Sequence, residues 1–175
     1  MMVNSKHYTL DLTLARLVYL TYARFKNCMD EILKGQGLTT EQYTVLVTVK
    51  YHEAPVRITD IARRTERTTN SVSMIVDRMV KADLLRRVRD RRDRRVVNVV
   101  ITSKGEDALK PASIVTLDFF RQLMSPLSHE DAHTFVGLFT MINRKMLELL
   151  NPGADIEGML KNDSERSAYL YKQLK

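Results

Sequence analysis

Residues 68–79 read TTNSVSMIVDRM, and this stretch decides the fold because its side chains separate onto two faces at helical spacing. Its apolar positions recur every three to four residues, at Val72, Ile75, Val76, Met79 and the following Val80. The opposite face is polar and carries Thr69, Asn70, Ser73, Asp77 and Lys81. The hydroxyl of Thr68 can cap the first free backbone N–H groups. The stretch therefore predicts an amphipathic helix with a polar N-terminal end.

A second short helix precedes this one, and a charged hairpin follows it. Ile58, Ile61 and Ala62 share one helical face, and only a few residues separate them from Thr68, which is typical of a helix-turn-helix. Residues 84–101 read LLRRVRDRRDRRVVNVVI, two short apolar or β-branched segments on either side of a charged tip. This pattern predicts a β-hairpin, so the fold class is mainly α with a small β-hairpin wing.

Longer helical patterns flank this segment on both sides. Apolar residues at helical spacing and capping residues predict further helices over 8–34, 39–54, 103–125, 129–150 and 156–174. Thr39 and Gln42 can form a capping box, while Thr102 and Ser128 can cap the two helices after the hairpin. Pro111 predicts a bend or a restart within the first of those two.

Composition and charge limit the classes of protein to which this chain can belong. Hydrophobic residues make up 44% of the 175-residue chain, which is enough for a real core. No stretch approaches the roughly 20 apolar residues of a membrane span, and residues 1–6 lack a secretory signal. The single cysteine, Cys28, fits a reducing cytoplasm. The net charge of +7 lies entirely in residues 57–95, where 13 basic and 6 acidic residues give 13 − 6 = +7. This concentration predicts a polyanionic partner.

Two groups of side chains have the chemistry to bind duplex DNA. Short polar side chains at the start of a helix can reach base edges or phosphates in the major groove, and arginines on a hairpin can contact phosphates or enter a minor groove. The first group comprises Thr68, Thr69, Asn70, Ser71, Ser73 and Arg78. The second comprises Arg89, Arg91, Arg92, Asp93, Arg94 and Arg95, in which an aspartate two residues from Arg95 can fix that arginine by a charge-assisted bond.

The order and spacing of these motifs resemble the multiple antibiotic resistance regulator (MarR) family from about Leu38 to Gly105. The resemblance rests on Ile61-Ala62, on residues 68–79 and 81–85, on Asp93-Arg94-Arg95 and on Thr102-Ser103-Lys104-Gly105. It implies a winged helix-turn-helix embedded in a helical dimerisation scaffold, and hence a homodimer. It also implies that Arg95 reaches the minor groove with Asp93 as its orienting partner.

Three positions depart from the family pattern. Asp83 stands where a glycine usually ends the recognition helix, although aspartate tolerates the left-handed conformation. Glu66 and Arg67 replace the usual glycine and apolar residue of the turn, which predicts a less tightly packed turn. Met74 occupies a position that is often arginine, which predicts a distinct operator preference.

Other motifs admit weaker functional interpretations. The segment 129–133, HEDAH, matches the HExxH pattern of zinc metalloproteases, but it lies at the exposed start of a helix and has no obvious third ligand. Cys28 is either a redox sensor or, as we expect, a packed residue of the first helix. Arg16, Tyr19 and Tyr22 could hold an aromatic acid, but a solvent-facing arginine or an intersubunit salt bridge is the simpler interpretation.

We therefore expect a cytoplasmic transcriptional repressor that binds a palindromic operator as a homodimer and is released by a small aromatic effector. The partners are double-stranded DNA and a second copy of the chain, with no membrane, metal or cofactor and no enzymatic activity. Alternatives are a metal or redox signal, or a non-specific DNA binder. The expected domains are 1–37 and 103–151 for dimerisation, 38–102 for DNA binding, and a tail over 152–175.

Overall fold

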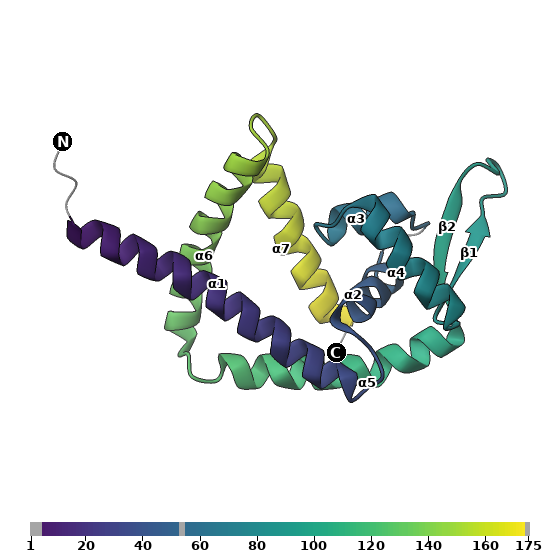
Figure 1. The fold of residues 1–175 in the computed structure, drawn as a ribbon, viewed down its shortest axis with the longest axis horizontal. Coiled ribbons are helices and arrows are strands. Elements are labelled where there is room, and N and C mark those ends of the chain that lie inside the picture. The colour runs from purple at the N-terminus through teal and green to yellow at the C-terminus, as the bar shows by residue number, and fades with distance from the viewer. Residues whose placement is uncertain (1–4, 53–54, 174–175) are drawn as a thin grey trace. The chain divides into compact units, whose positions relative to one another are not determined.

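The computed structural model describes residues 5–52 and 55–173 and divides into two compact units, one up to Thr116 and one from Leu117 onward. The elements within the described residues are, in order, α1 (Ser5–Lys34), α2 (Thr40–Lys50), α3 (Ile58–Arg64), α4 (Thr69–Lys81), β1 (Leu85–Arg89), β2 (Val97–Ile101), α5 (Ser103–Met124), α6 (His129–Leu150) and α7 (Ile156–Gln173) (Figure 1). The mainly α fold with a two-stranded wing is confirmed. The predicted end of the last helix at Leu174 lies outside the described residues.

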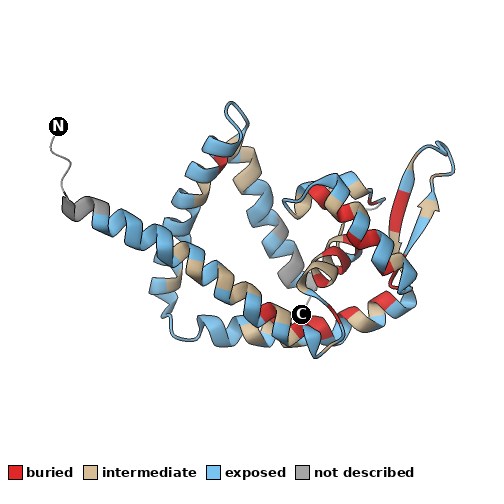
Figure 2. Cartoon of the chain, in the orientation of Figure 1, coloured by how far each residue is buried: buried red, intermediate tan, exposed pale blue. Residues whose placement is uncertain are grey.

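The core of the first unit forms where α2, α3 and α4 pack together. Most of the apolar stripe expected on α4 is buried (Figure 2), with Val80 half-buried, and α4 packs against α2 and α3. Residues without measurable exposure come from all three helices: Leu46, Ile61, Val72, Val76 and Met79. Burying a side chain of this size stabilises the fold by about 1.5–3 kcal/mol, so this core holds the helix-turn-helix in one arrangement.

The hairpin continues from α4 and pairs in a single antiparallel register, from Leu85 opposite Ile101 to Arg89 opposite Val97. Leu85 and Val99 face the core and are buried. A third backbone segment joins the strands, because the N–H of Val99 donates to the carbonyl of Val56 at 2.8 Å. The base of the hairpin is thus anchored, while its charged tip projects away.

The junction between α4 and α5 holds the base of the hairpin. Asp83 has a φ of 61°, so it adopts the left-handed conformation expected for a residue in the place of a glycine. The hydroxyl of Thr102 donates to the carbonyl of Asp83 at 2.7 Å and accepts from the N–H of Gly105 at 3.0 Å. Lys104 Nζ donates to the carbonyl of Ala82 at 2.8 Å. Thr102 therefore both caps α5 and ties it to the end of α4.

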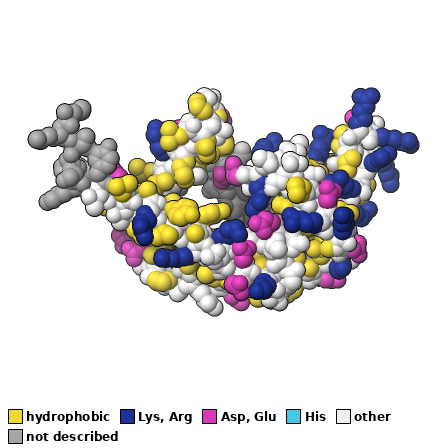
Figure 3. Space-filling view, viewed as in Figure 1, with side chains coloured by type: hydrophobic (Ala, Val, Ile, Leu, Met, Phe, Trp, Pro, Cys, Tyr) yellow, Lys and Arg dark blue, Asp and Glu magenta, His cyan; other side chains and the backbone are white. Residues whose placement is uncertain are grey.

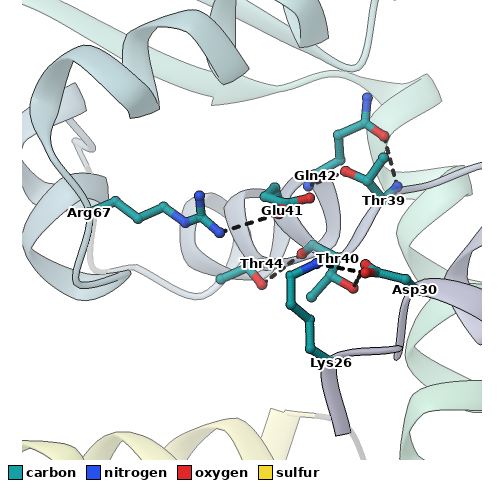
Figure 4. A network of polar contacts seen from close by, with 8 residues as sticks. All are labelled: Lys26, Asp30, Thr39, Thr40, Glu41, Gln42, Thr44 and Arg67. Carbon is teal, nitrogen blue, oxygen red and sulfur yellow. Dashed lines mark hydrogen bonds and ion pairs between the residues drawn. The ribbon is translucent and has the colours of Figure 1, made fainter. Parts of the chain in front are cut away.

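A polar network connects α1 to the start of α2 (Figure 4). Asp30 accepts a hydrogen bond from Lys26 Nζ at 2.7 Å and from Thr40 Oγ1 at 2.5 Å. These two bonds hold the pKa of the Asp30 carboxyl below its ordinary value. The predicted capping box is confirmed, since Thr39 Oγ1 accepts from the N–H of Gln42, whose side chain accepts from the N–H of Thr39.

The second unit contains the helical hairpin of α6 and α7 together with the end of α5. Ser128 Oγ caps α6 by accepting from the N–H of Asp131 at 3.1 Å. Arg144 Nη2 of α6 donates to Glu157 Oε2 of α7 at 3.2 Å. Leu147 is buried, but most side chains of α6 are exposed (Figure 2). None of the helices in the described part of the chain is both long enough and apolar enough to cross a membrane.

Of the bend or restart expected at Pro111, the restart is not observed. The helix does not restart at Pro111 but runs unbroken from Ser103 to Met124. Proline removes one backbone donor, and the carbonyl left without a partner is that of Asp107. Both residues lie on the exposed side of the helix, where water can bind that carbonyl, so the helix continues.

Candidate nucleic-acid interface

The start of α4 presents the polar side chains that the sequence predicts at its N-terminal end. Thr68 is the N-cap, and its hydroxyl accepts from the N–H of Ser71 at 3.2 Å. Thr69 and Asn70 are exposed, whereas Ser71 and Ser73 are half-buried. The first turn therefore offers an amide and several hydroxyls to a ligand, next to backbone N–H groups that favour a negative charge.

The remaining exposed face of α4 continues this surface toward its C-terminal end. Asn70, Met74, Asp77 and Lys81 follow at spacings of four, three and four residues, so they form one stripe opposite the buried stripe. Arg78 is exposed beside this stripe, and its Nε donates to the carbonyl of Met74 at 3.3 Å. Asparagine, lysine and arginine at these positions can each donate hydrogen bonds to a polyanion.

Polar contacts hold the turn between α3 and α4. Glu66 has a φ of 52°, the left-handed conformation that a glycine would adopt more readily. The N–H of Arg67 donates to the carbonyl of Ala62 at 3.0 Å, and its Nη2 lies 3.4 Å from Glu41 Oε1 (Figure 4). The two residues that depart from the family pattern thus still form a turn, and one of them ties it to α2.

Two aspartates shape the tip of the hairpin through its backbone. Asp90 Oδ1 accepts from the N–H groups of Arg92 at 2.8 Å and Asp93 at 3.1 Å. These bonds, first that from Arg92, hold the pKa of the Asp90 carboxyl below its ordinary value. Asp93 Oδ1 accepts from the N–H of Arg95 at 2.9 Å. Asp93 therefore contacts Arg95 as expected, but through the main chain and not through the guanidinium.

The arginine side chains of the hairpin are almost all free to bind a ligand. Within residues 5–52 and 55–173, only Arg87 of the seven arginines has an ion-pair partner, Asp77 Oδ1 of α4 at 2.7 Å. The six others are exposed: Arg86, Arg89, Arg91, Arg92, Arg94 and Arg95. Figure 3 shows Lys and Arg side chains gathered around the hairpin. So dense a set of like charges repels itself until counterions or phosphates neutralise it.

The structure brings the two predicted groups into one unit and joins them. The α4 helix packs on β1, and the Arg87–Asp77 ion pair links the exposed face of α4 to the hairpin. Sequence reasoning missed this pair and also the role of Asp90. A signal for Asp90 was present, since an aspartate followed by a tight charged turn favours a side-chain bond to the amide two residues on.

The residues considered for an effector or a redox signal lie exposed along α1. Arg16, Tyr19 and Tyr22 lie along α1 at spacings of three residues, and all three are exposed in the described chain. Cys28 is also exposed in the single chain, so the packing expected for its side chain is not seen within this unit. It directly precedes the buried Met29, and a step of 100° around the helix turns it away from the core.

The two histidines of the HExxH segment lie side by side at the exposed start of α6. The ring centroids of His129 and His133 are 4.5 Å apart in an edge-on arrangement. The described residues contain no group of three or more His, Cys, Asp or Glu side chains that could hold a metal ion. The arrangement therefore offers two imidazoles without the third protein ligand of a catalytic zinc site.

Comparison with known proteins agrees with this geometry. The model of the MarR family matches residues 36–96, from the end of α1 to the tip of the hairpin. The HTH-type transcriptional regulator YpoP of Bacillus subtilis is 24% identical over 129 residues, which are 74% of this chain and 90% of YpoP.

Two solved structures share the fold. The organohalide-sensing transcriptional regulator RdhR, in its 2,4-dichlorophenol-bound form, superposes with a TM-score of 0.73 at 22% identity, over 82% of this chain and 85% of RdhR. MepR of Staphylococcus aureus, in a complex with DNA, has a TM-score of 0.68 at 24% identity, over 78% of this chain and 96% of MepR. The chain is thus similar to the MarR family over the helix-turn-helix and the hairpin, and it shares the winged helix-turn-helix fold of these two structures.

Proposed function

We propose that this protein is a transcriptional regulator that binds a specific DNA duplex as a homodimer. The observation that carries the proposal is the pairing of two surfaces in one unit: the polar first turn of α4, and a hairpin on which six arginines have no ion-pair partner among the described residues. A polar helix start suits base edges in the major groove, and arginines suit the phosphates and the adjacent minor groove. The DNA complex of MepR, which has the same fold, supports this interpretation.

Each surface has a distinct role in this proposal. Asn70 can pair with adenine through two hydrogen bonds, while the hydroxyls of Thr69, Ser71 and Ser73 can bond to bases or phosphates. At the hairpin tip Arg95 enters the minor groove, and Asp93 sets the local backbone from which Arg95 projects. The other arginines of the tip bind phosphates and supply affinity that does not depend on sequence.

The test of the wing is the variant Arg95→Ala, measured against Lys110→Ala as a control with the same change of charge on α5. The ligand is a duplex that the protein selects from a random pool, and binding is followed by fluorescence anisotropy over a range of salt concentrations. We expect Arg95→Ala to bind more weakly than the parent and the control at physiological salt, because the guanidinium that enters the minor groove is lost. Equal affinity of Arg95→Ala and the parent would refute the wing role.

The homodimer rests on the apolar side chains that the single chain leaves exposed. They include residues of α1 and many residues of α6: Leu10, Leu12, Leu14, Leu17, Phe135, Val136, Leu138, Met141, Met146 and Leu149. Each unit has its own exposed apolar surface, on α1 in the first and on α6 in the second. Exposed apolar surface marks an interaction site, and a two-fold dimer would cover the same surfaces on both copies. Such a dimer would present two α4 helices about 34 Å apart to a palindromic operator. Sedimentation equilibrium should give twice the mass of the chain at micromolar concentration, and a monomer would exclude this arrangement.

The proposal also includes a response to a small-molecule signal. We infer repression that is relieved by a small aromatic effector held at Arg16, Tyr19 and Tyr22, and the 2,4-dichlorophenol bound to RdhR supports an aromatic ligand. An effector that binds the free form better shifts the population away from DNA. A thermal-shift screen of benzoates and chlorophenols, with Arg16→Ala as the variant, tests this. The exposure of Cys28 favours a redox signal as the alternative, which peroxide treatment of Cys28→Ser and the parent would distinguish.

A further inference from the structure

Met74 is an apolar side chain in the middle of the polar face of α4. It is 59% exposed, whereas the other apolar side chains of that helix are buried or half-buried. Its neighbours on the exposed stripe are Asn70 on one side and Asp77 and Lys81 on the other. A charged, polar surround suits a nucleic acid better than an apolar protein partner, because nothing else on this stripe would favour a dry interface.

The position of Met74 relative to Asn70 follows from helix geometry. Four residues separate them, which is one turn and about 6 Å along the helix axis. Base pairs stack about 3.4 Å apart, so the two side chains would reach base pairs within two steps of each other. The carbonyl of Met74 accepts from Arg78 Nε at 3.3 Å, so the arginine of the next turn lies alongside the same residue.

The chemistry of the groove then selects one group for Met74. The major-groove edges of the four bases present hydrogen-bond donors and acceptors and a single apolar group, the methyl group of thymine. A thioether side chain cannot donate a hydrogen bond, but it is flexible and polarizable and can adapt its shape to a methyl group. We infer that Met74 is a specificity-determining residue that contacts a thymine methyl group within two base pairs of the base bound by Asn70. This inference rests on the proposed function, since it requires α4 to lie in the major groove.

Deoxyuridine provides the test, because it pairs as thymine does and lacks only the methyl group. The duplex selected by the parent protein is resynthesised with deoxyuridine at one thymine of each half-site in turn. At the contacted thymine we expect the parent to lose about fourfold in affinity for each half-site, which corresponds to about 0.8 kcal/mol for one buried CH₂ or CH₃ group. Replacing both half-sites should therefore weaken binding by about sixteenfold.

Two variants show whether the loss is due to Met74. Met74→Ala should bind the thymine and deoxyuridine duplexes equally, whereas Met74→Leu, which keeps the apolar surface, should keep most of the difference. Thymines in the flanks of the same duplex serve as controls and should tolerate deoxyuridine in all three proteins. Met74 is exposed, so both variants should melt at the parent temperature.

The outcomes separate the inference from the proposed function. If the parent binds its selected duplex specifically but tolerates deoxyuridine at every thymine, Met74 contacts no methyl group and the inference fails alone. The same holds if a deoxyuridine penalty persists unchanged in Met74→Ala. If the parent does not distinguish the selected duplex from random duplexes, the proposed function fails and the inference fails with it.

Discussion

Replacing Gly105 by alanine should destabilise the base of the hairpin. Gly105 is buried in the first turn of α5, and a Cβ atom built on it would lie 2.2 Å from the carbonyl oxygen of Leu84 and 2.8 Å from Ile101 Cγ1. Both distances are shorter than real Cβ contacts. The Leu84 carbonyl cannot move away freely, because it accepts from the N–H of Thr102 at 3.2 Å while the N–H of Leu84 donates to Met79 at 2.9 Å.

The magnitude follows from two opposing effects. Forcing a methyl group into a packed site costs about 1–3 kcal/mol, and a clash with held backbone belongs at the upper end of this range. Alanine in place of glycine within a helix returns about 1 kcal/mol. The net loss in the free energy of unfolding should therefore be about 2 kcal/mol, which lowers the Tm of a chain of this size by about 4–8 °C.

Urea and thermal unfolding followed by circular dichroism would measure this change. Asp107→Ala is the matched control, because Asp107 is exposed two residues further along the same helix and its replacement should change stability by less than about 0.5 kcal/mol. If Gly105→Ala were as stable as the parent, the close approach of α5 to the Leu84 carbonyl would be refuted.

Three further predictions follow from other contacts. Thr68→Ala should lose about 1 kcal/mol of stability by urea unfolding, since it removes the N-cap of α4, and Thr68→Ser should restore most of it. The bonds to Lys26 and Thr40 lower the pKa of Asp30. The Asp30 carboxylate therefore contributes its full stabilisation above the pKa that it has in the unfolded chain, and this stabilisation is lost as the pH falls through the lower pKa of the folded chain. Between about pH 5 and pH 3 the parent should lose more stability than Asp30→Asn does. A double-mutant cycle on Glu41→Ala and Arg67→Ala should give a coupling of about 0.2–1 kcal/mol, the usual range for an exposed ion pair, and a coupling near zero would show that the pair does not hold the turn.

The helix-turn-helix and the hairpin could be predicted from sequence because their patterns are short-range. The apolar spacing of residues 72–79 shows directly which face of α4 is buried, and the change of period after Leu84 indicates strands. The left-handed Asp83 was also predictable, because the residue type and its place at the end of a helix agree. In each case neighbouring residues alone determine the outcome.

The expectations that failed, and the contacts that were missed, depend on details that the spacing of residues in the sequence does not contain. A two-residue separation placed Asp93 beside Arg95 but could not tell whether the carboxylate would bind the main chain or the guanidinium. Proximity to an apolar stripe suggested that Cys28 is packed, yet a single step around the helix exposes it. The Arg87–Asp77 pair joins a helix to a strand, so it depends on how the two elements pack and leaves no local signal.

Selection of bound duplexes from a random pool tests the central claim most directly, since it asks whether α4 and the arginine hairpin together distinguish DNA sequences. We predict that the recovered sequences converge on an inverted repeat with half-site centres one helical turn, about 10 base pairs, apart. Recovery of sequences with no common motif, at a salt concentration that still permits binding, would contradict the account and leave a DNA binder that senses charge alone.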